Sequence, residues 1–174
     1  MKIKSSVLSF ALSVAFLMIC QTSSVKASYW VNGCPTSSQL SGKWYSFSPT
    51  YRLCQTDYYT WNTTGAEESS WKSDPVGLLC SYRPWDSPGY TQARVYIPYP
   101  DSRQTTNARY FRWGTSSNYV MIGSVNQYNS YGWVYLNTIT WSQTDRLKLY
   151  DVTINETKYS KHVDLDAFGV TCGN

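Results

Sequence analysis

Short alternating stretches separated by turn residues constrain the fold of this chain more than any other feature. In ARVYIPYP (93–100) every second residue is apolar, and RLKLYDV (146–152) alternates in the same way, with Leu147 and Leu149 facing inward. A period of two predicts a strand with one buried face. Stretches of five to nine residues between turn signals predict an all-β protein: an antiparallel, jelly-roll-like β-sandwich.

Further strands are predicted on the same grounds, and one of them breaks the alternation. The other predicted strands are 42–47, 56–61, 77–85, 108–113, 119–127 and 162–170. In GWVYLNTITW (132–141), counting by twos from Leu136 places Ile139 and Trp141 on the opposite face. A β-bulge at Asn137 would restore a common inward face, because one extra residue reverses the alternation and Asn tolerates positive φ.

The first residues are typical of an export signal. MKIK is basic, residues 7–20 are apolar, and VKA (25–27) ends in a small residue, which predicts a signal peptide over 1–27. Lipid attachment at Cys20 is the alternative, and the residues before Cys20 suit it poorly. We therefore expect a secreted, extracellular protein.

The expected mature chain consists of an irregular or β segment over 28–76, packed on the same domain as a sandwich over 77–174. It contains twelve basic and eleven acidic residues, without a Lys/Arg block. This charge balance argues against nucleic acid as a partner and against membrane binding after signal cleavage. The sequence does not set the oligomeric state.

Four cysteines remain after the signal: Cys34, Cys54, Cys80 and Cys172. An even number in an exported chain predicts two disulfides, with three pairings open. The pairing we favour joins Cys34 to Cys54 and Cys80 to Cys172, which ties the last strand to an early one. Zinc is disfavoured, because no CxxC pair occurs and the single histidine, His162, is not spaced from a cysteine as a ligand.

An ordered set of segments over about residues 90–171 resembles a known family. The segments are ARVYIPYPDSRQTTNARY (93–110), VNQ (125–127), GWVYLNTITW (132–141), RLKLYD (146–151) and VDLDAFGV (163–170). Together they resemble the golvesin C-terminal-like domain. The resemblance implies a secreted, carbohydrate-binding-like β-sandwich of the kind attached to extracellular hydrolases or surface proteins. Asn137 stands where that family has glycine.

Three ionisable residues share one face of the last predicted strand: His162, Asp164 and Asp166. An acid–base pair or a hard-cation site is one interpretation. A structural role is favoured, because Asp166 approaches the core and needs a partner there, for which Arg94 or Arg109 is available. We predict no catalytic residue, no cofactor and no metal, and leave a structural calcium ion at Asp164 and Asp166 open.

Aromatic residues are the more informative feature, since the chain has 8 Trp and 16 Tyr. Flat rings stack on the C–H face of a sugar while polar neighbours bond its hydroxyls. Trp133 and Trp141 are expected in the core. The predicted ligand-binding residues lie on or beside turns: Trp85, Gln127, Tyr128, Asn129 and Tyr131.

The sequence therefore predicts a secreted, non-catalytic binding module whose partner is a polysaccharide or cell-wall glycan. Two alternatives stay open. A small extracellular hydrolase would depend on Asp166. A secreted protein-interaction module would use 28–76, the segment that the family resemblance does not cover.

Overall fold

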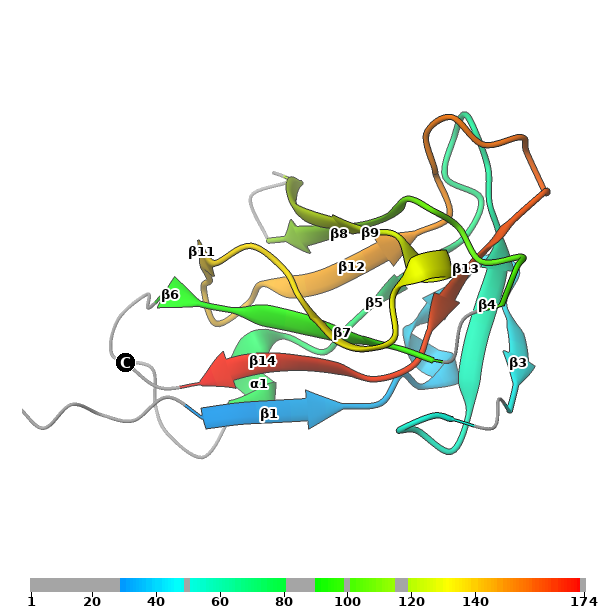
Figure 1. Ribbon diagram of the computed structural model, residues 1–174. Helices are drawn as coiled ribbons and strands as arrows, with labels where there is room; N and C mark the ends of the chain where they lie inside the picture. The colour runs from blue at the N-terminus through cyan, green and yellow to red at the C-terminus, as the bar shows by residue number, and fades with distance from the viewer. Residues whose placement is uncertain (1–28, 49–50, 81–89, 99–100, 115–118, 173–174) are drawn as a thin grey trace, which may run out of the picture.

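The computed structural model describes residues 29–48, 51–80, 90–98, 101–114 and 119–172. Its strands pair antiparallel in two larger sheets that form the layers of a sandwich, which confirms the predicted fold class (Figure 1). Sheet A contains, in order, β1 (Tyr29–Gly33), β14 (Phe168–Cys172), β7 (Ala93–Ile97) and β10 (Gly132–Tyr135). Sheet B contains β2 (Leu40–Ser41), β5 (Ser70–Lys72), β12 (Arg146–Tyr150), β8 (Ala108–Trp113) and β9 (Val120–Val125).

Smaller elements complete the described structure. Sheet C lies at one end of the sandwich and contains β13 (His162–Leu165), β4 (Asp57–Trp61) and β3 (Tyr45–Phe47) (Figure 1). A two-stranded sheet pairs β11 (Ile139–Thr140) with β6 (Tyr90–Thr91). The helical segments are η1 (Ser37–Gln39), α1 (Val76–Leu79) and η2 (Gln127–Asn129). None of the helices in the described ranges is long and apolar enough to cross a membrane.

The predicted alternation is found where the two layers meet. In β7, Ala93, Val95 and Ile97 are buried, and in β12 so are Leu147 and Leu149. The apolar side chains of these strands therefore fill the space between the sheets, and the residues that alternate with them face outward.

The bulge predicted at Asn137 is wrong, because no single strand runs through this residue: β10 ends at Tyr135, and β11 begins at Ile139 with a different partner. The φ of Asn137 is not positive either. The chain instead leaves sheet A here: the Leu136 amide donates to the Ala93 carbonyl at 2.9 Å, and the Asn137 amide donates to Ile122 of sheet B at 2.7 Å. Leu136 and Trp141 are both buried, as expected. A crossing between layers, rather than an extra residue within one strand, directs both side chains inward.

The strand predicted over 77–85 is also wrong in its described part. Residues Val76–Leu79 form the short helix α1, and 81–89 lie outside the described residues. Val76 and Cys80, four residues apart, are both buried, which is the spacing of one helix face. The Val76 amide also donates to the Asp145 carbonyl at 2.8 Å, so a neighbouring turn satisfies one of the free amides at the helix start.

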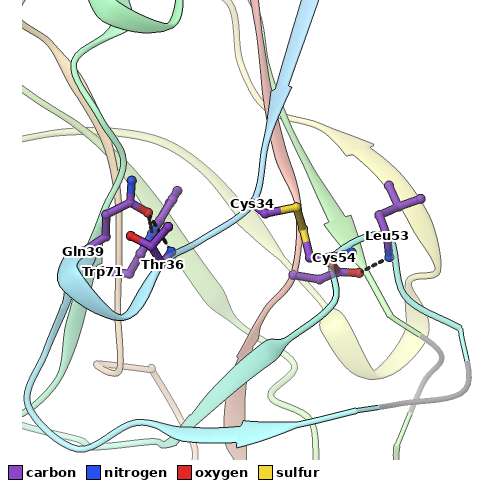
Figure 2. The surroundings of a disulfide bond; sticks show 7 residues. Cys34, Thr36, Gln39, Leu53, Cys54 and Trp71 are labelled. Carbon is purple, nitrogen blue, oxygen red and sulfur yellow. Dashed lines mark hydrogen bonds between the residues drawn. A yellow bond between two sulfur atoms is a disulfide. The ribbon is translucent and has the colours of Figure 1, made fainter.

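Both favoured disulfides are present. Cys34–Cys54 and Cys80–Cys172 each have a Cα–Cα distance of 5.6 Å, and the second joins the end of α1 to the last strand, β14. Figure 2 shows the first bridge, with Leu53 next to Cys54. The same figure shows Gln39, whose side-chain oxygen accepts from the Trp71 indole. Two disulfides fit an oxidising compartment such as the outside of a cell.

Candidate functional site

The outward face of sheet A is largely aromatic. We call it the aromatic face; it consists of Trp30, Arg94, Tyr96, Tyr131, Trp133 and Tyr135. Strand pairing places Tyr135 beside Arg94 and Trp133 beside Tyr96. The outer rings are open to solvent, with Tyr131 55% and Tyr135 56% exposed. An uncovered sheet face with this many rings is typical of a binding surface.

Arg94 lies at the centre of this face between two indole rings. Its guanidinium carbon is 4.0 Å from the centroid of the Trp30 ring and 4.1 Å from that of the Trp133 ring. Its Nη2 donates to Asn32 Oδ1 at 2.9 Å. Two cation–π contacts and a hydrogen bond hold the side chain in place, so its charge is oriented before any ligand arrives.

A glycine makes room for this arrangement. Gly169 of β14 pairs with Arg94 of β7 and with Asn32 of β1. A Cβ at this position would lie 2.6 Å from Asn32 Oδ1 and 3.1 Å from Arg94 Nε. Glycine therefore lets the guanidinium lie close against the sheet.

Edge contacts join the remaining rings. Tyr135 meets Trp30 with ring centroids 5.7 Å apart, and Tyr96 meets Trp133 at 5.6 Å and Tyr131 at 6.3 Å. Burial, followed by a hydrogen bond to Tyr131, raises the pKa of Tyr96 to about 12. The Tyr96 hydroxyl is therefore protonated at neutral pH.

The chemistry of the aromatic face is that of a surface for uncharged or acidic ligands. Arg94 is the one charged residue in the four strands of sheet A. Rings can stack on the apolar face of a sugar, and the guanidinium and the Asn32 amide can bond hydroxyls or carboxylates. None of the six described residues that make up the face carries a carboxylate that would repel an anion.

The structure separates the predicted ligand-binding residues. Tyr131 belongs to the aromatic face. Tyr128 is exposed on η2, with Lys161 Nζ 5.6 Å from its ring centroid, and Asn129 is exposed beside it. Trp85 lies outside the described residues.

Gln127 has a different environment from its neighbours, because it is fully buried. Its side-chain amide donates to the Tyr110 hydroxyl at 3.2 Å and to the Asp164 carbonyl at 2.8 Å, and it accepts from the Asp164 amide at 2.9 Å. These bonds fasten η2 to β13. A ligand at the surface does not reach this side chain, so we assign Gln127 to the fold.

Sequence reasoning missed most of the aromatic face. Trp133 was expected in the core, and it is instead half-buried on the outer side of sheet A. The alternation of β10 held the signal: since Val134 packs against the core, Trp133 and Tyr135 must point the other way. The alternation of β7 likewise indicates that Arg94 and Tyr96 face outward. Trp30 carried no comparable signal, because its contact with Arg94 depends on the pairing of distant strands.

The ionisable residues His162, Asp164 and Asp166 are all buried, and they are used by the fold. His162 Nδ1 lies 2.9 Å from Asp164 Oδ1, and Gln104 Nε2 donates to Asp164 Oδ2 at 2.5 Å. Asp166 accepts from the amides of Leu53 and Cys54, each at 3.0 Å. The arginine partner expected for Asp166 is wrong, because backbone amides of the disulfide loop hold this carboxylate.

Asp57, which sequence reasoning did not single out, joins this group. It is fully buried and neither carboxyl oxygen has a donor. Burial, together with the adjacent Asp166, raises the pKa of Asp57 to about 8. Asp57 is thus largely a neutral acid at neutral pH. Within the described ranges, no group of three or more His, Cys, Asp and Glu side chains is arranged to hold a metal ion.

Comparison with known proteins gives a likeness of fold. No protein-family model and no curated protein matches the sequence, so the golvesin-like resemblance stays a prediction. Among solved structures, the chain matches a xanthan lyase from Paenibacillus with a TM-score of 0.59 and 16% identity. The match covers 83% of this chain and 13% of the lyase. The chain therefore shares the fold of a small segment of a polysaccharide-active protein.

Proposed function

We propose that this protein is a binding module for extracellular polysaccharide and that the aromatic face of sheet A is its contact surface. The observation that carries the proposal is a partly exposed sheet face with two Trp and three Tyr rings around one oriented arginine. The likeness in fold to a segment of a polysaccharide lyase supports the same conclusion.

The geometry of the face suits a chain better than a small compact ligand. Tyr131 directly precedes β10, which is an edge strand of sheet A, Tyr135 is the last residue of β10, and Trp133 lies between them. Successive outward residues of a strand are about 7 Å apart. A linear glycan can therefore contact several rings at once, each through a different sugar unit.

Charge favours a polysaccharide that carries carboxylates. Arg94 is the single charge of sheet A, and its two indole neighbours reduce its exposure to water, which strengthens its attraction for an anion. The proposal therefore includes an order of affinity: an acidic glycan binds more tightly than a neutral one of the same backbone.

The η2 turn is the natural extension of this surface. Tyr131 contacts Tyr96 on the aromatic face, and Tyr128 and Asn129 lie a few residues earlier on the same turn. We include Tyr128 and Asn129 as outer contacts of the glycan. Trp85, which lies outside the described residues, stays a ligand contact predicted from the sequence alone.

Affinity electrophoresis in gels containing xanthan or a neutral β-glucan tests the proposal. A Tyr131→Ala/Tyr135→Ala double variant is expected to lose at least about tenfold in affinity, since stacked aromatic contacts dominate such surfaces. Tyr119→Ala is the matched control, because this tyrosine is 51% exposed beside sheet B. Equal retardation of wild type and double variant would contradict the proposal.

A further inference from the structure

A groove separate from the aromatic face lies beside sheet C. It has a volume of about 390 Å³, within the range of small-molecule sites. Its main lining residues are Lys43, Tyr45, Trp61, Glu68, Asp151 and Tyr159. None of them belongs to the aromatic face, and they come from β3, β4 and the loops around them.

Asp151 lines this groove, and one of its two carboxyl oxygens has no hydrogen-bond partner. The residue is 1% exposed. Its Oδ1 accepts from the Glu68 amide at 3.2 Å and from Thr63 Oγ1 at 3.5 Å, whereas its buried Oδ2 has no donor. A buried acceptor without a partner is costly, so a donor that enters from the groove is strongly favoured.

Aromatic rings border the same groove. Tyr45 and Tyr159 are exposed and Trp61 is half-buried. The Tyr159 hydroxyl donates to Glu68 Oε2 at 2.8 Å, and Lys158 bonds the other oxygen of Glu68. Tyr159 has a φ of 61°, a conformation that side chains rarely adopt, and its amide donates to Asn62 at 2.9 Å. Glu68 and Asn62 thus fix this ring at the edge of the groove.

We propose that this groove is a second ligand site, which takes a single hydroxyl-rich ring such as one sugar unit. The ring stacks against Trp61 or Tyr45, and one hydroxyl donates to Asp151 Oδ2. Further hydroxyls bond Lys43 and Glu68 at the rim. Burial raises the pKa of Asp151, and a donated hydroxyl favours its charged form.

The site goes beyond the proposed function, because it recognises a sugar unit and not an extended chain. A protein with both sites would hold one glycan at two places or two glycans at once, and the second contact would raise the overall affinity through effective concentration.

Titration of the ¹⁵N-labelled protein with glucose, mannose and glucuronate tests the proposal. Saturable shifts are expected for the Trp61 indole and the amides near Asp151. Asp151→Asn is expected to weaken binding at least about tenfold, because a side-chain amide replaces one acceptor oxygen with a donor. The exposed Tyr45→Ala variant, which removes a stacking surface without touching the buried carboxylate, is expected to weaken binding several-fold.

Tyr119→Ala serves as the control, because this exposed tyrosine belongs neither to the groove nor to the aromatic face. It is expected to bind the monosaccharide probes as the wild type does. Non-saturable shifts with all three probes, or unchanged affinity in both Tyr45→Ala and Asp151→Asn, would overturn the second site and leave the aromatic face unaffected.

Discussion

The aromatic face and the buried ionisable residues differ in exposure and in the partners of their side chains. His162, Asp164 and Asp166 form the most reactive combination in the sequence, yet all three are buried and held by hydrogen bonds. Of the two exposed tyrosines at the edge of sheet A, the sequence pointed to Tyr131 through its turn and gave no reason to choose Tyr135. The comparison teaches that residue type was enough to single out the three buried ionisable residues. The aromatic face could be identified as a whole only from the pairing of its strands.

The path of the chain explains why the three ionisable residues are buried. Residues 162–172 cross from sheet C to sheet A as β13 and β14, interrupted at Asp166 and Ala167. Asp166 accepts from the amides of Leu53 and Cys54. Figure 2 shows these two residues at the Cys34–Cys54 bridge. Carboxylates here satisfy backbone donors of an irregular loop, as buried polar groups must.

The largest effect is expected at Asp164. In Asp164→Ala the amide of Gln104 and the ring of His162 lose their buried acceptor. The free energy of unfolding should fall by roughly 2–4 kcal/mol, measured by urea titration. The folded fraction should retain polysaccharide affinity. Loss of binding without loss of stability would show that the ionisable group, and not the aromatic face, contacts the glycan.

The next largest effect is expected at Trp133. Trp133→Ala removes one of the two rings that enclose Arg94 and the edge contact with Tyr96. Affinity for xanthan should fall about 10–100-fold, while the free energy of unfolding should fall by only about 1–2 kcal/mol. Affinity gels and urea titration measure the two quantities. A large loss of stability with unchanged affinity would place Trp133 with the structural residues.

The pH dependence of stability tests the neutral state of Asp57. In the unfolded chain this carboxyl ionises near 3.8, and in the fold at about 8, so the folded protein binds the extra proton between these values. The free energy of unfolding should therefore fall as pH rises from about 4 to 8. Asp57→Asn, which stays neutral, should flatten this slope; an unchanged slope would contradict the assignment.

The smallest effect is expected for a change of the central cation. Arg94→Lys keeps the charge and loses the planar contact with Trp30 and Trp133. The free energy of unfolding should fall by about 0.5–1 kcal/mol. Affinity for an acidic glycan should fall a few-fold, while affinity for a neutral one should change less. An equal loss for both glycans would assign Arg94 a structural role.

Local pattern was enough to predict much of the fold. The alternation of β7 and β12 is confirmed, because it depends on a short-range signal. The two disulfides are confirmed as well; the even number of cysteines predicted that they form, and the favoured pairing was one of three that this number left open. The turn at Asn137 was not predictable, since the chain there crosses to Ile122 in the other sheet, a tertiary event without a local signature.

The candidate site was less accessible to sequence reasoning. Tyr131 was predicted as a ligand-binding residue because it lies beside a turn, where an aromatic side chain is often exposed. Trp133 was assigned to the core on size, although the inward Val134 required the opposite. Trp30 and Gly169 join the site through the pairing of β1 with β14 and of β14 with β7. Because these strands are far apart in the sequence, no local sequence pattern predicts that they pair.

The indole resonances of the tryptophans provide the most direct test of the central claim. Trp30 and Trp133 lie on the aromatic face, whereas Trp71 and Trp141 are buried in the core. During titration of the ¹⁵N-labelled protein with soluble xanthan fragments, the indole signals of Trp30 and Trp133 should shift in a saturable way while those of Trp71 and Trp141 stay in place. Saturable binding with no shift at Trp30 or Trp133 would contradict the account.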